Sequence, residues 1–171
     1  NGQLVDRPAT QVPTNATVEI KARPPFVSRG GEKLLTALTE FELDVTGAIC
    51  ADVGASTGGF TDCLLQHGAA KVYAIDVGSG ILHYKLRTDT RVVVMEKTNA
   101  RYLETLPEPV QLVVCDAAFI SLTILLPAMR GWLTNDGHMV VLVKPQFEVG
   151  PDQVGKGGVV RQPALHRQAI L

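Results

Sequence analysis

The stretch from Asp52 to Phe60, Asp-Val-Gly-Ala-Ser-Thr-Gly-Gly-Phe, has the residue types best suited to holding a ligand. The largely apolar residues 48–51 before it predict a buried strand, and residues 61–67 predict a helix that stops at Gly68. A glycine-rich turn between a strand and a helix presents backbone N–H groups and the helix N-terminus to a ligand. We therefore expect a small-molecule site here, although a purely structural glycine turn has the same pattern.

The spacing within this turn narrows the class of ligand. A dinucleotide fingerprint needs glycine at position 56, where the backbone must approach a pyrophosphate, and the chain has Ser56. A Walker A loop fits from Gly54 to Gly59, but Phe60 replaces its essential lysine and leaves no charge for terminal phosphates. A ligand that combines an adenosine with a small carboxylate remains, and S-adenosylmethionine meets that description.

The next two predicted strands end in polar groups that suit the same ligand. Asp76 ends the second strand about twenty residues beyond the turn, where an acid accepts hydrogen bonds from a ribose diol. Residues 98–100 follow the third strand, and Asn99 is well placed for the edge of an adenine. The alternatives are that Asp76 caps the turn at Val77-Gly78 and that Asn99 is an ordinary turn residue.

The fourth and fifth predicted strands each end in a charged residue. Asp116 follows the apolar residues 112–115, and Lys144 follows the wholly apolar residues 139–143. A lysine in that place is costly to bury unless a partner pairs with it, and Asp116 ends the neighbouring strand. Lys33, on the helix before the glycine turn, can reach the same rim. These three residues predict either a reactive lysine–carboxylate cluster or a structural salt bridge.

Alternating strands and helices must position these residues. Apolar runs predict strands near 48–53, 71–76, 92–96, 111–115 and 138–143. Apolar spacing predicts helices near 32–41, 58–67, 80–87, 121–132 and from 163 onward, with Pro127 kinking the fourth of them. Such alternation with apolar strands indicates an α/β fold, a doubly wound and mostly parallel sheet with helices on both faces. Ligands of such sheets bind beyond the carboxyl ends of the strands.

The first residues differ from the rest of the chain. Short strands are predicted at 4–5 and 18–20, but about twenty residues cannot bury a core alone. We expect residues 1–21 to be an arm or the tail of another domain, and residues 22–28, with their paired prolines, to be a linker. Residues 29–171 are the main domain, which we expect to be incomplete because the sequence stops within a predicted helix.

The overall charge of the chain gives no general attraction to a polyanion such as nucleic acid. The formal net charge is −1, so any basic surface must be local. Lys21, Arg23, Arg29 and Lys33 stand close together against one acid, Glu32. This segment predicts either a solvated linker and helix start or a basic lip for a polyanion such as nucleic acid.

The cysteines and the apolar regions point to a reducing compartment. Cys50, Cys63 and Cys115 lack C-x-x-C spacing, so neither a disulfide framework nor a zinc site is expected. The most apolar region, 112–129, is interrupted by Asp116 and by a proline, which argues against a membrane span. We expect a cytoplasmic protein without stable membrane association and without a metal, and the sequence leaves its oligomeric state open.

Five separated motifs carry a resemblance to a known family. They are Val27–Leu34, Asp52–Phe60, Cys115–Leu122, Lys144–Glu148 and Gly157–Val160. In this order they closely resemble the TlyA group of the FtsJ-like methyltransferases, which is often labelled haemolysin A. The resemblance implies a Rossmann-like fold, S-adenosyl-L-methionine as methyl donor, and 2′-O-methylation of ribose in ribosomal RNA, with ribosomal subunits as partners. Residues 1–21 resemble the last strands of the S-four-type RNA-binding domain that precedes the catalytic domain in that family.

The resemblance also implies roles for particular residues. The family uses a Lys-Asp-Lys-Glu tetrad, and Lys33, Asp116 and Lys144 match its first three positions. The glutamate lies on a later strand that this chain lacks, and Glu148 is not that residue. We expect cofactor contacts from Gly54, Ser56, Thr57, Gly58, Gly59, Phe60, Asp76, Val77, Asn99 and Asp116. We expect RNA contacts from Arg29, Lys33 and Lys156.

The mechanism that this implies depends on removal of a proton. A ribose 2′-hydroxyl is a poor nucleophile until it is deprotonated, and a lysine that acts as base must be neutral. The nearby ammonium of Lys33 disfavours the charged form of Lys144, which makes Lys144 the candidate base. Asp116 is expected to orient that lysine and to lie near the sulfonium, and no metal is needed.

Three other functions remain open at this point. The chain could belong to an RNA-binding or ribosome-binding protein that has kept the cofactor fold without turnover. It could be membrane-active, as the family label suggests, but no amphipathic cationic segment of sufficient length is present. It could methylate a small molecule; the basic segment before Lys33 and the glycine-flanked Lys156 favour RNA only modestly, because such loop lysines are usually just solvated.

Overall fold

The computed structural model describes residues 10–17 and 24–171. Residues 10–17 are exposed and contain a turn in which the Ala16 N–H donates to the Pro13 carbonyl. The strands predicted at 4–5 and 18–20, and the basic residues Lys21 and Arg23, lie outside the described residues, so the expectation of an S-four-type remnant over 1–21 stays a prediction.

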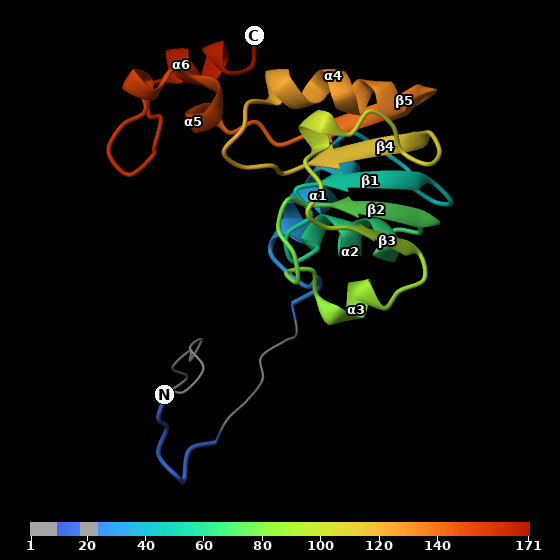
Figure 1. The fold of residues 1–171 in the computed structure, drawn as a ribbon. Helices are drawn as coiled ribbons and strands as arrows, with labels where there is room; N and C mark the ends of the chain where they lie inside the picture. The colour runs from blue at the N-terminus through green and yellow to red at the C-terminus, as the bar shows by residue number, and fades with distance from the viewer. Residues whose placement is uncertain (1–9, 18–23) are drawn as a thin grey trace.

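One sheet of five parallel strands organises the domain (Figure 1). Its order is β3-β2-β1-β4-β5, so the direction of winding reverses between β1 and β4. The strands are β1 (Ile49–Val53), β2 (Lys71–Ile75), β3 (Val92–Met95), β4 (Val110–Cys115) and β5 (Leu133–Val141). The three central strands are buried almost throughout, which explains their continuous apolar sequences.

Helices cover both faces of the sheet (Figure 1). The side chains of α1 (Gly30–Glu40), α2 (Gly59–Gln66) and α3 (Tyr84–Arg87) share one apolar core with one face of the strands. Those of α4 (Leu122–Trp132) and the short η1 (Ala100–Tyr102) share a second core with the opposite face. The prediction of a doubly wound α/β fold is confirmed.

Three short elements follow β5. They are α5 (Pro145–Glu148), η2 (Pro151–Gln153) and α6 (Pro163–Gln168). Figure 1 shows α5 and α6 together at one end of the sheet, where a small third cluster of buried apolar residues packs the chain that follows α5 against α6. Pro163 occupies the first turn of α6, and Gln162 makes no side-chain cap, as its residue type predicts.

Two element boundaries were predicted wrongly. The strand expected from 138 begins at Leu133, directly after α4, because Leu133 pairs with Val110 and the ladder resumes only at His138 opposite Leu112. The intervening polar residues look like a turn in the sequence but form an irregularity within the strand. The helix expected over 80–87 forms only at Tyr84–Arg87, where the His83 side chain accepts a hydrogen bond from the Lys85 N–H and caps it.

The cysteines lie in the two cores. Cys50, Cys63 and Cys115 are free thiols and fully buried, as their apolar surroundings in the sequence predict. Burial raises the pKa of the Cys50 thiol to about 12, so this group stays protonated and unreactive at neutral pH. None of the three takes part in the site described below.

Candidate active site

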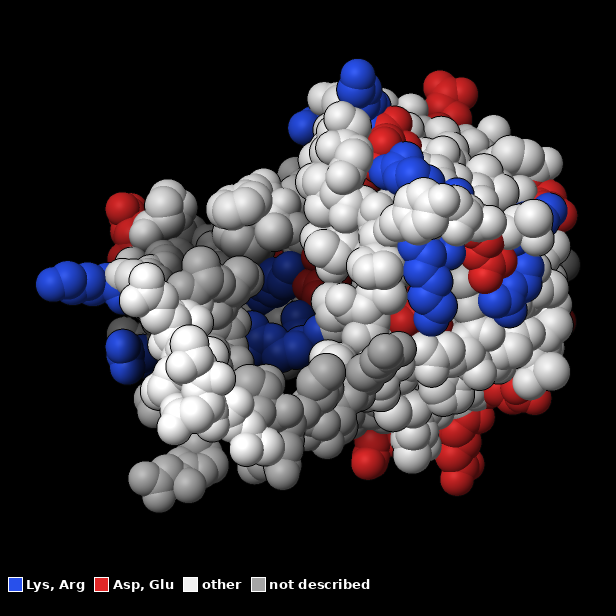
Figure 2. Space-filling model, turned by 90° about the horizontal axis from the view of Figure 1, so that it is seen from below, with Lys and Arg blue, Asp and Glu red and all other residues white. Residues whose placement is uncertain are grey.

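A cavity of about 1150 Å³ opens at the carboxyl ends of the central strands. Figure 2 shows this face of the molecule hollowed, with Lys or Arg side chains meeting acidic ones inside the hollow. The cavity lies beside the point where the winding of the sheet reverses, which is where such folds bind their ligands. Of the residues predicted for the site, those that line it are Arg29, Lys33, Gly54, Ser56, Thr57, Gly59, Phe60, Asp76, Val77, Asn99, Asp116 and Lys144.

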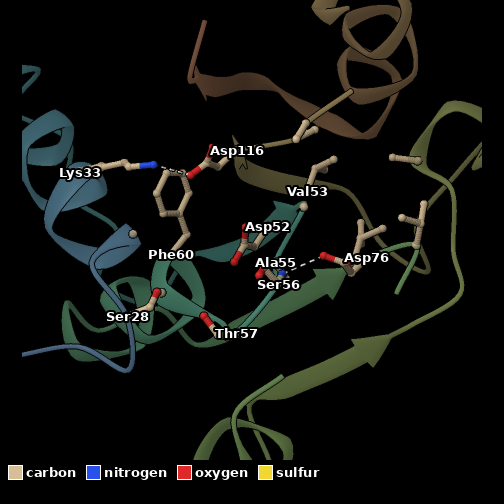
Figure 3. Close-up of a pocket in the computed structure, with 18 of the residues that line it drawn as sticks. Ser28, Lys33, Asp52, Val53, Ala55, Ser56, Thr57, Phe60, Asp76 and Asp116 are labelled. Atoms are coloured by element: carbon tan, nitrogen blue, oxygen red, sulfur yellow. Dashed lines mark hydrogen bonds and ion pairs between the residues drawn. The ribbon is translucent and has the colours of Figure 1, made fainter. Parts of the chain in front are cut away.

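The glycine turn is tied to β2 and to the chain after β4. Ser56 has a positive φ of 49°, and its N–H donates to Asp76 Oδ2 at 2.7 Å (Figure 3). Gly54 has a φ of +79°, and a Cβ there would lie 3.0 Å from the backbone N and Cα of Ala117. Gly54 is therefore required both by its conformation and by the close approach of a neighbouring loop.

The last two glycines of the turn serve packing between elements. A Cβ at Gly58 would overlap Leu86 on α3, and one at Gly59 would overlap the Ser28 hydroxyl and lie 2.9 Å from the Gly31 N. Gly58 does not line the cavity, so the structure brings every predicted member of the turn to it except this one. Sequence spacing alone could not separate glycines that face a ligand from glycines that admit another helix.

Asp52 is buried beneath the turn and is only half satisfied. Its Oδ2 accepts hydrogen bonds from the Thr61 N–H at 2.9 Å and the Thr61 hydroxyl at 2.7 Å. Its Oδ1 is buried and has no partner among the residues that the structure describes. Burial raises the pKa of the Asp52 carboxyl to about 7, against the lowering effect of the Thr61 hydrogen bonds. Sequence reasoning identified this residue only as the end of a strand.

Asp76 caps the turn at Val77-Gly78, which was one of the two roles that the sequence suggested for it. Its Oδ2 accepts the Ser56 N–H and its Oδ1 accepts the Gly78 N–H, both at 2.7 Å. Each carboxylate oxygen keeps a second lone pair, so these two bonds leave acceptor capacity for a ligand. Asn99 likewise caps η1, because its Oδ1 accepts the Arg101 N–H at 3.0 Å. Both residues line the cavity while holding the loops that form it.

Lys33, Asp116 and Lys144 meet as the sequence predicts. Asp116 Oδ2 accepts from Lys33 Nζ at 3.0 Å (Figure 3), and Asp116 Oδ1 lies 2.7 Å from Lys144 Nζ. The Lys33 side chain is 51% exposed, whereas those of Asp116 and Lys144 are 20% exposed. One carboxylate thus holds two lysines of unequal exposure at the rim of the cavity.

Lys144 has more partners than the sequence suggested. Besides Asp116 Oδ1, its Nζ donates to the backbone carbonyls of Asp116 at 3.1 Å and Ala117 at 2.9 Å. Three acceptors match the three N–H donors of an ammonium group. Lys144 follows the end of β5 by three residues rather than by one, and Leu142 still donates to the Cys115 carbonyl at 2.8 Å, which keeps the chain beside β4.

Glu148 is occupied elsewhere, in agreement with its exclusion from the tetrad. Its carboxylate accepts from the Ser121 hydroxyl at 2.7 Å and from the Leu122 N–H at 2.9 Å, at the start of α4. Lys156 lies in the loop closed by the bridge between Gly155 and Val159 and does not line the cavity. Its expected contact with RNA stays a prediction.

The described residues form neither a metal site nor a membrane span. Across residues 10–17 and 24–171, no three metal-ligating side chains gather in a way that could hold an ion. Within the same residues, no helix has the length and apolarity needed to cross a membrane.

Comparison with known proteins places this fold and site in a family. The model of the FtsJ-like methyltransferase family matches residues 26–171. A 16S/23S rRNA (cytidine-2′-O)-methyltransferase, TlyA, of Mycobacterium tuberculosis is 52% identical over 169 residues, which are 96% of this chain and 63% of that protein. The protein named Hemolysin A of Brachyspira hyodysenteriae is 45% identical over 177 residues, covering this chain completely and 72% of its own length.

Solved structures agree with the sequence relatives. A protein from Streptococcus thermophilus superposes with a TM-score of 0.83 at 46% identity, over 88% of this chain and 56% of that one. An S-adenosylmethionine-dependent methyltransferase from Mesorhizobium loti shares the fold, with a TM-score of 0.57 at 20% identity over 67% of this chain and 55% of that one. The chain spans about 63% of the length of the Mycobacterium relative. On the extent of these matches, the chain belongs to the FtsJ-like methyltransferase family.

Proposed function

We propose that the protein transfers the methyl group of S-adenosylmethionine to a ribose 2′-hydroxyl of ribosomal RNA. The observation that carries this proposal is the Lys33–Asp116–Lys144 cluster, which lines the same cavity as the glycine turn. The name of the Mycobacterium relative, an rRNA (cytidine-2′-O)-methyltransferase, supports the class of substrate. Ribosomal subunits are the corresponding partners.

The residues of the cavity fit the methyl donor. Asp76 and Asn99 keep acceptor capacity on the side of β2 and β3, which suits a ribose diol and an adenine edge. The Oδ1 of Asp52 is buried without a partner in the described part of the chain, and a further donor there would relieve a desolvated oxygen. Asp116 carries the one negative charge of the Lys33–Asp116–Lys144 cluster, so it would offset part of the repulsion between the two lysines and a positively charged sulfonium. The bound donor supplies a methyl group on that sulfonium.

The lysines provide for the proton of the hydroxyl. Two ammonium groups share one carboxylate here. When one lysine loses a proton, the other lysine and Asp116 remain as an ion pair with no net charge, beside a neutral amine. Lys144 is the proposed base because Asp116 and two carbonyls hold its Nζ in place, whereas Lys33 is more exposed and pairs with Asp116 alone among the residues that the structure describes. To accept the proton, the neutral Lys144 must give up one of its three present hydrogen bonds to free a lone pair.

The decisive experiment measures transfer of tritium from labelled S-adenosylmethionine to ribosomal subunits that lack the modification. We expect label in the RNA, and alkali-resistant dinucleotides that locate it on a 2′-oxygen. Free nucleosides as acceptors would distinguish a small-molecule methyltransferase. Binding of the methyl donor in calorimetry without transfer to either acceptor would contradict the proposal and favour an RNA-binding protein without turnover.

A matched pair of variants isolates the cluster. Lys144→Ala should strongly lower the rate of transfer, while Lys97→Gln, which changes an exposed lysine outside the cavity, should leave it unchanged. Equal activity of the two variants would show that the cluster is a structural salt bridge and that the chemistry lies elsewhere.

A further inference from the structure

A second, smaller groove of about 490 Å³ adjoins the main cavity. Phe119 and Ile120 line both, so the two spaces share a wall. The residues that line the groove are Arg101, Phe119, Ile120, Ser121, Ile124 and Phe147. They come from three separate parts of the chain: η1, the loop and start of helix after β4, and α5. None of the roles assigned above to the rim of the cavity uses Arg101 or Phe147.

An aromatic pair forms one side of this groove. The ring centroids of Phe119 and Phe147 are 5.2 Å apart and tilted by 50°. Phe119 is 91% exposed and has a positive φ of 63°, a conformation that is unfavourable for an aromatic residue. An exposed apolar ring held in a strained backbone three residues after Asp116 indicates a surface that is kept for a ligand rather than for stability.

A cation, Arg101, also lines the groove. The Arg101 guanidinium lies 5.3 Å from the centre of the Tyr102 ring, and Tyr102 is 72% exposed. No carboxylate within residues 10–17 and 24–171 forms an ion pair with Arg101, so its charge is available to a partner. Asn99 fixes the start of this short helix, and the Trp132 ring N–H donates to the Leu103 carbonyl at its end.

We propose that this groove binds the nucleotide that neighbours the target nucleotide in a single-stranded segment of the RNA. The neighbouring base stacks on the Phe147 side of the aromatic pair, and Arg101 contacts a backbone phosphate. Unstacked bases are recognised on aromatic side chains, and phosphates by arginine, in single-stranded RNA sites. This inference rests on the proposed function, because the shared wall at Phe119 is what puts the groove one step from the reacting ribose.

RNA suits the groove better than a protein segment does. A protein-docking surface would be expected to be apolar at its centre with charge at the rim. Here a cation that forms no ion pair with the described residues lines the same groove as an aromatic pair, and the groove shares a wall with the main cavity; phosphates and bases alternate along RNA and require this combination. Binding of a protein in this groove is an alternative outcome, which the measurements on RNA affinity distinguish.

The experiment compares variants of the purified protein in methyl transfer to unmodified ribosomal subunits. Arg101→Gln should raise the KM for the subunit on the order of tenfold. Phe147→Leu should raise it about fivefold or more, and Phe147→Tyr, which keeps a ring, should restore it. The affinity for S-adenosylmethionine, measured by calorimetry, should not change in any of them, because none of these residues lines the cofactor side of the cavity.

Binding of a fluorescein-labelled single-stranded oligoribonucleotide provides a second readout that does not need turnover. For Arg101→Gln, the slope of log affinity against log salt should become shallower by about 0.7, the value for one lost phosphate contact on a single strand. Arg130→Gln, an exposed arginine at the end of α4 outside the groove, is the matched control and should leave the slope unchanged.

The outcomes separate failure of the groove from failure of the proposed function. If the wild-type protein methylates subunits and Arg101→Gln and Phe147→Leu keep its KM and its salt slope, the groove does not bind RNA. If both variants keep RNA affinity but lose co-purifying ribosomal protein, the groove binds a protein instead. If the wild-type protein transfers no methyl group but the oligoribonucleotide slope still responds to Arg101→Gln, the groove stands and the proposed reaction falls.

Discussion

Asp116 is the residue on which the geometry of the rim depends. Each of its carboxylate oxygens accepts from a different lysine, and its backbone carbonyl accepts from Lys144 as well. Asp116 thereby fixes the distance between Lys33 and Lys144 and the position of the loop that follows β4. Because Lys144 also bonds to the Ala117 carbonyl, any change at position 144 acts on this loop as well as on the chemistry.

Substitutions at Lys144 must therefore distinguish a role in proton transfer from a role in holding the loop after β4. Lys144→Ala should lower the single-turnover rate of methyl transfer by about 10²–10⁴, the usual contribution of a general base. Lys144→Arg can still donate to the carbonyls but stays charged, so it should be as slow as Lys144→Ala while unfolding at a denaturant concentration closer to wild type. Recovery of the rate by arginine would rule out proton transfer to this residue.

Asp52 predicts a pH dependence of stability. Its folded pKa of about 7 lies above the ordinary carboxyl value of 3.8, so the folded state binds more protons than the unfolded state between these two values. The contribution of this group to stability is therefore present below about pH 4 and is lost as pH rises through 7. Between pH 5 and pH 8 the loss should be about 2–3 kcal/mol.

Urea unfolding at these two pH values tests the assignment to Asp52. Asp52→Asn keeps an acceptor for Thr61 but cannot ionise, so the free energy of unfolding should fall less from pH 5 to pH 8 than in the wild type. The same fall in both proteins would mean that other groups cause it and that Asp52 is not strongly perturbed.

At the scale of the elements, helix packing depends on glycines. Gly59→Ala should destabilise the fold by about 1–3 kcal/mol, because the new methyl group would overlap Ser28 and force α1 away from α2. Gly131→Ala in α4 is the matched control, since nothing lies within 4 Å of its Cβ position, and should stabilise by up to about 1 kcal/mol. Urea midpoints measure both changes; a neutral Gly59→Ala would show that α1 yields easily.

The elements themselves were largely predictable, and the failures have physical causes. Apolar runs and helical spacing identify all five strands and the helices that contain a full apolar face, because burial dictates those residues. They fail at Leu133, where a polar segment stays inside a strand through a register shift, and at α3, whose single turn depends on the cap from His83. Whether Pro127 kinks α4 stays a prediction; the helix continues across it.

The residues of the site that lie at the ends of strands could be predicted from the sequence. Asp76, Asp116 and Lys144 each stand at or just after a strand, and parallel strands bring such ends together. The same reasoning could not find the carbonyl partners of Lys144 or the exposure of Phe119, since both depend on the path of a loop. Phe119 directly follows two alanines, which gave no periodic signal.

At the scale of the whole molecule, a net charge of −1 means that the proposed RNA binding must depend on local basic groups. The affinity for single-stranded RNA should therefore respond to individual cations at the cavity. Arg29→Gln, at the start of α1, should make the salt slope of binding shallower by about 0.7. Lys156→Gln should do the same only if its loop reaches the RNA. Anisotropy titrations between 50 and 200 mM salt, over which such contacts weaken strongly, measure both slopes.

Because the winding reverses between β1 and β4, the residues of the site come from two consecutive halves of the chain. Lys33, Asp52 and Asp76 all precede the exposed Glu104-Thr105 link, and Asp116 and Lys144 follow it. A chain opened at this link would yield two fragments, each with half of a site and neither with a lysine pair. They would meet again along the β1–β4 ladder, at the contact of η1 with α4 and at the Lys33–Asp116 ion pair, so recovered methyl transfer would report reassembly of a split enzyme.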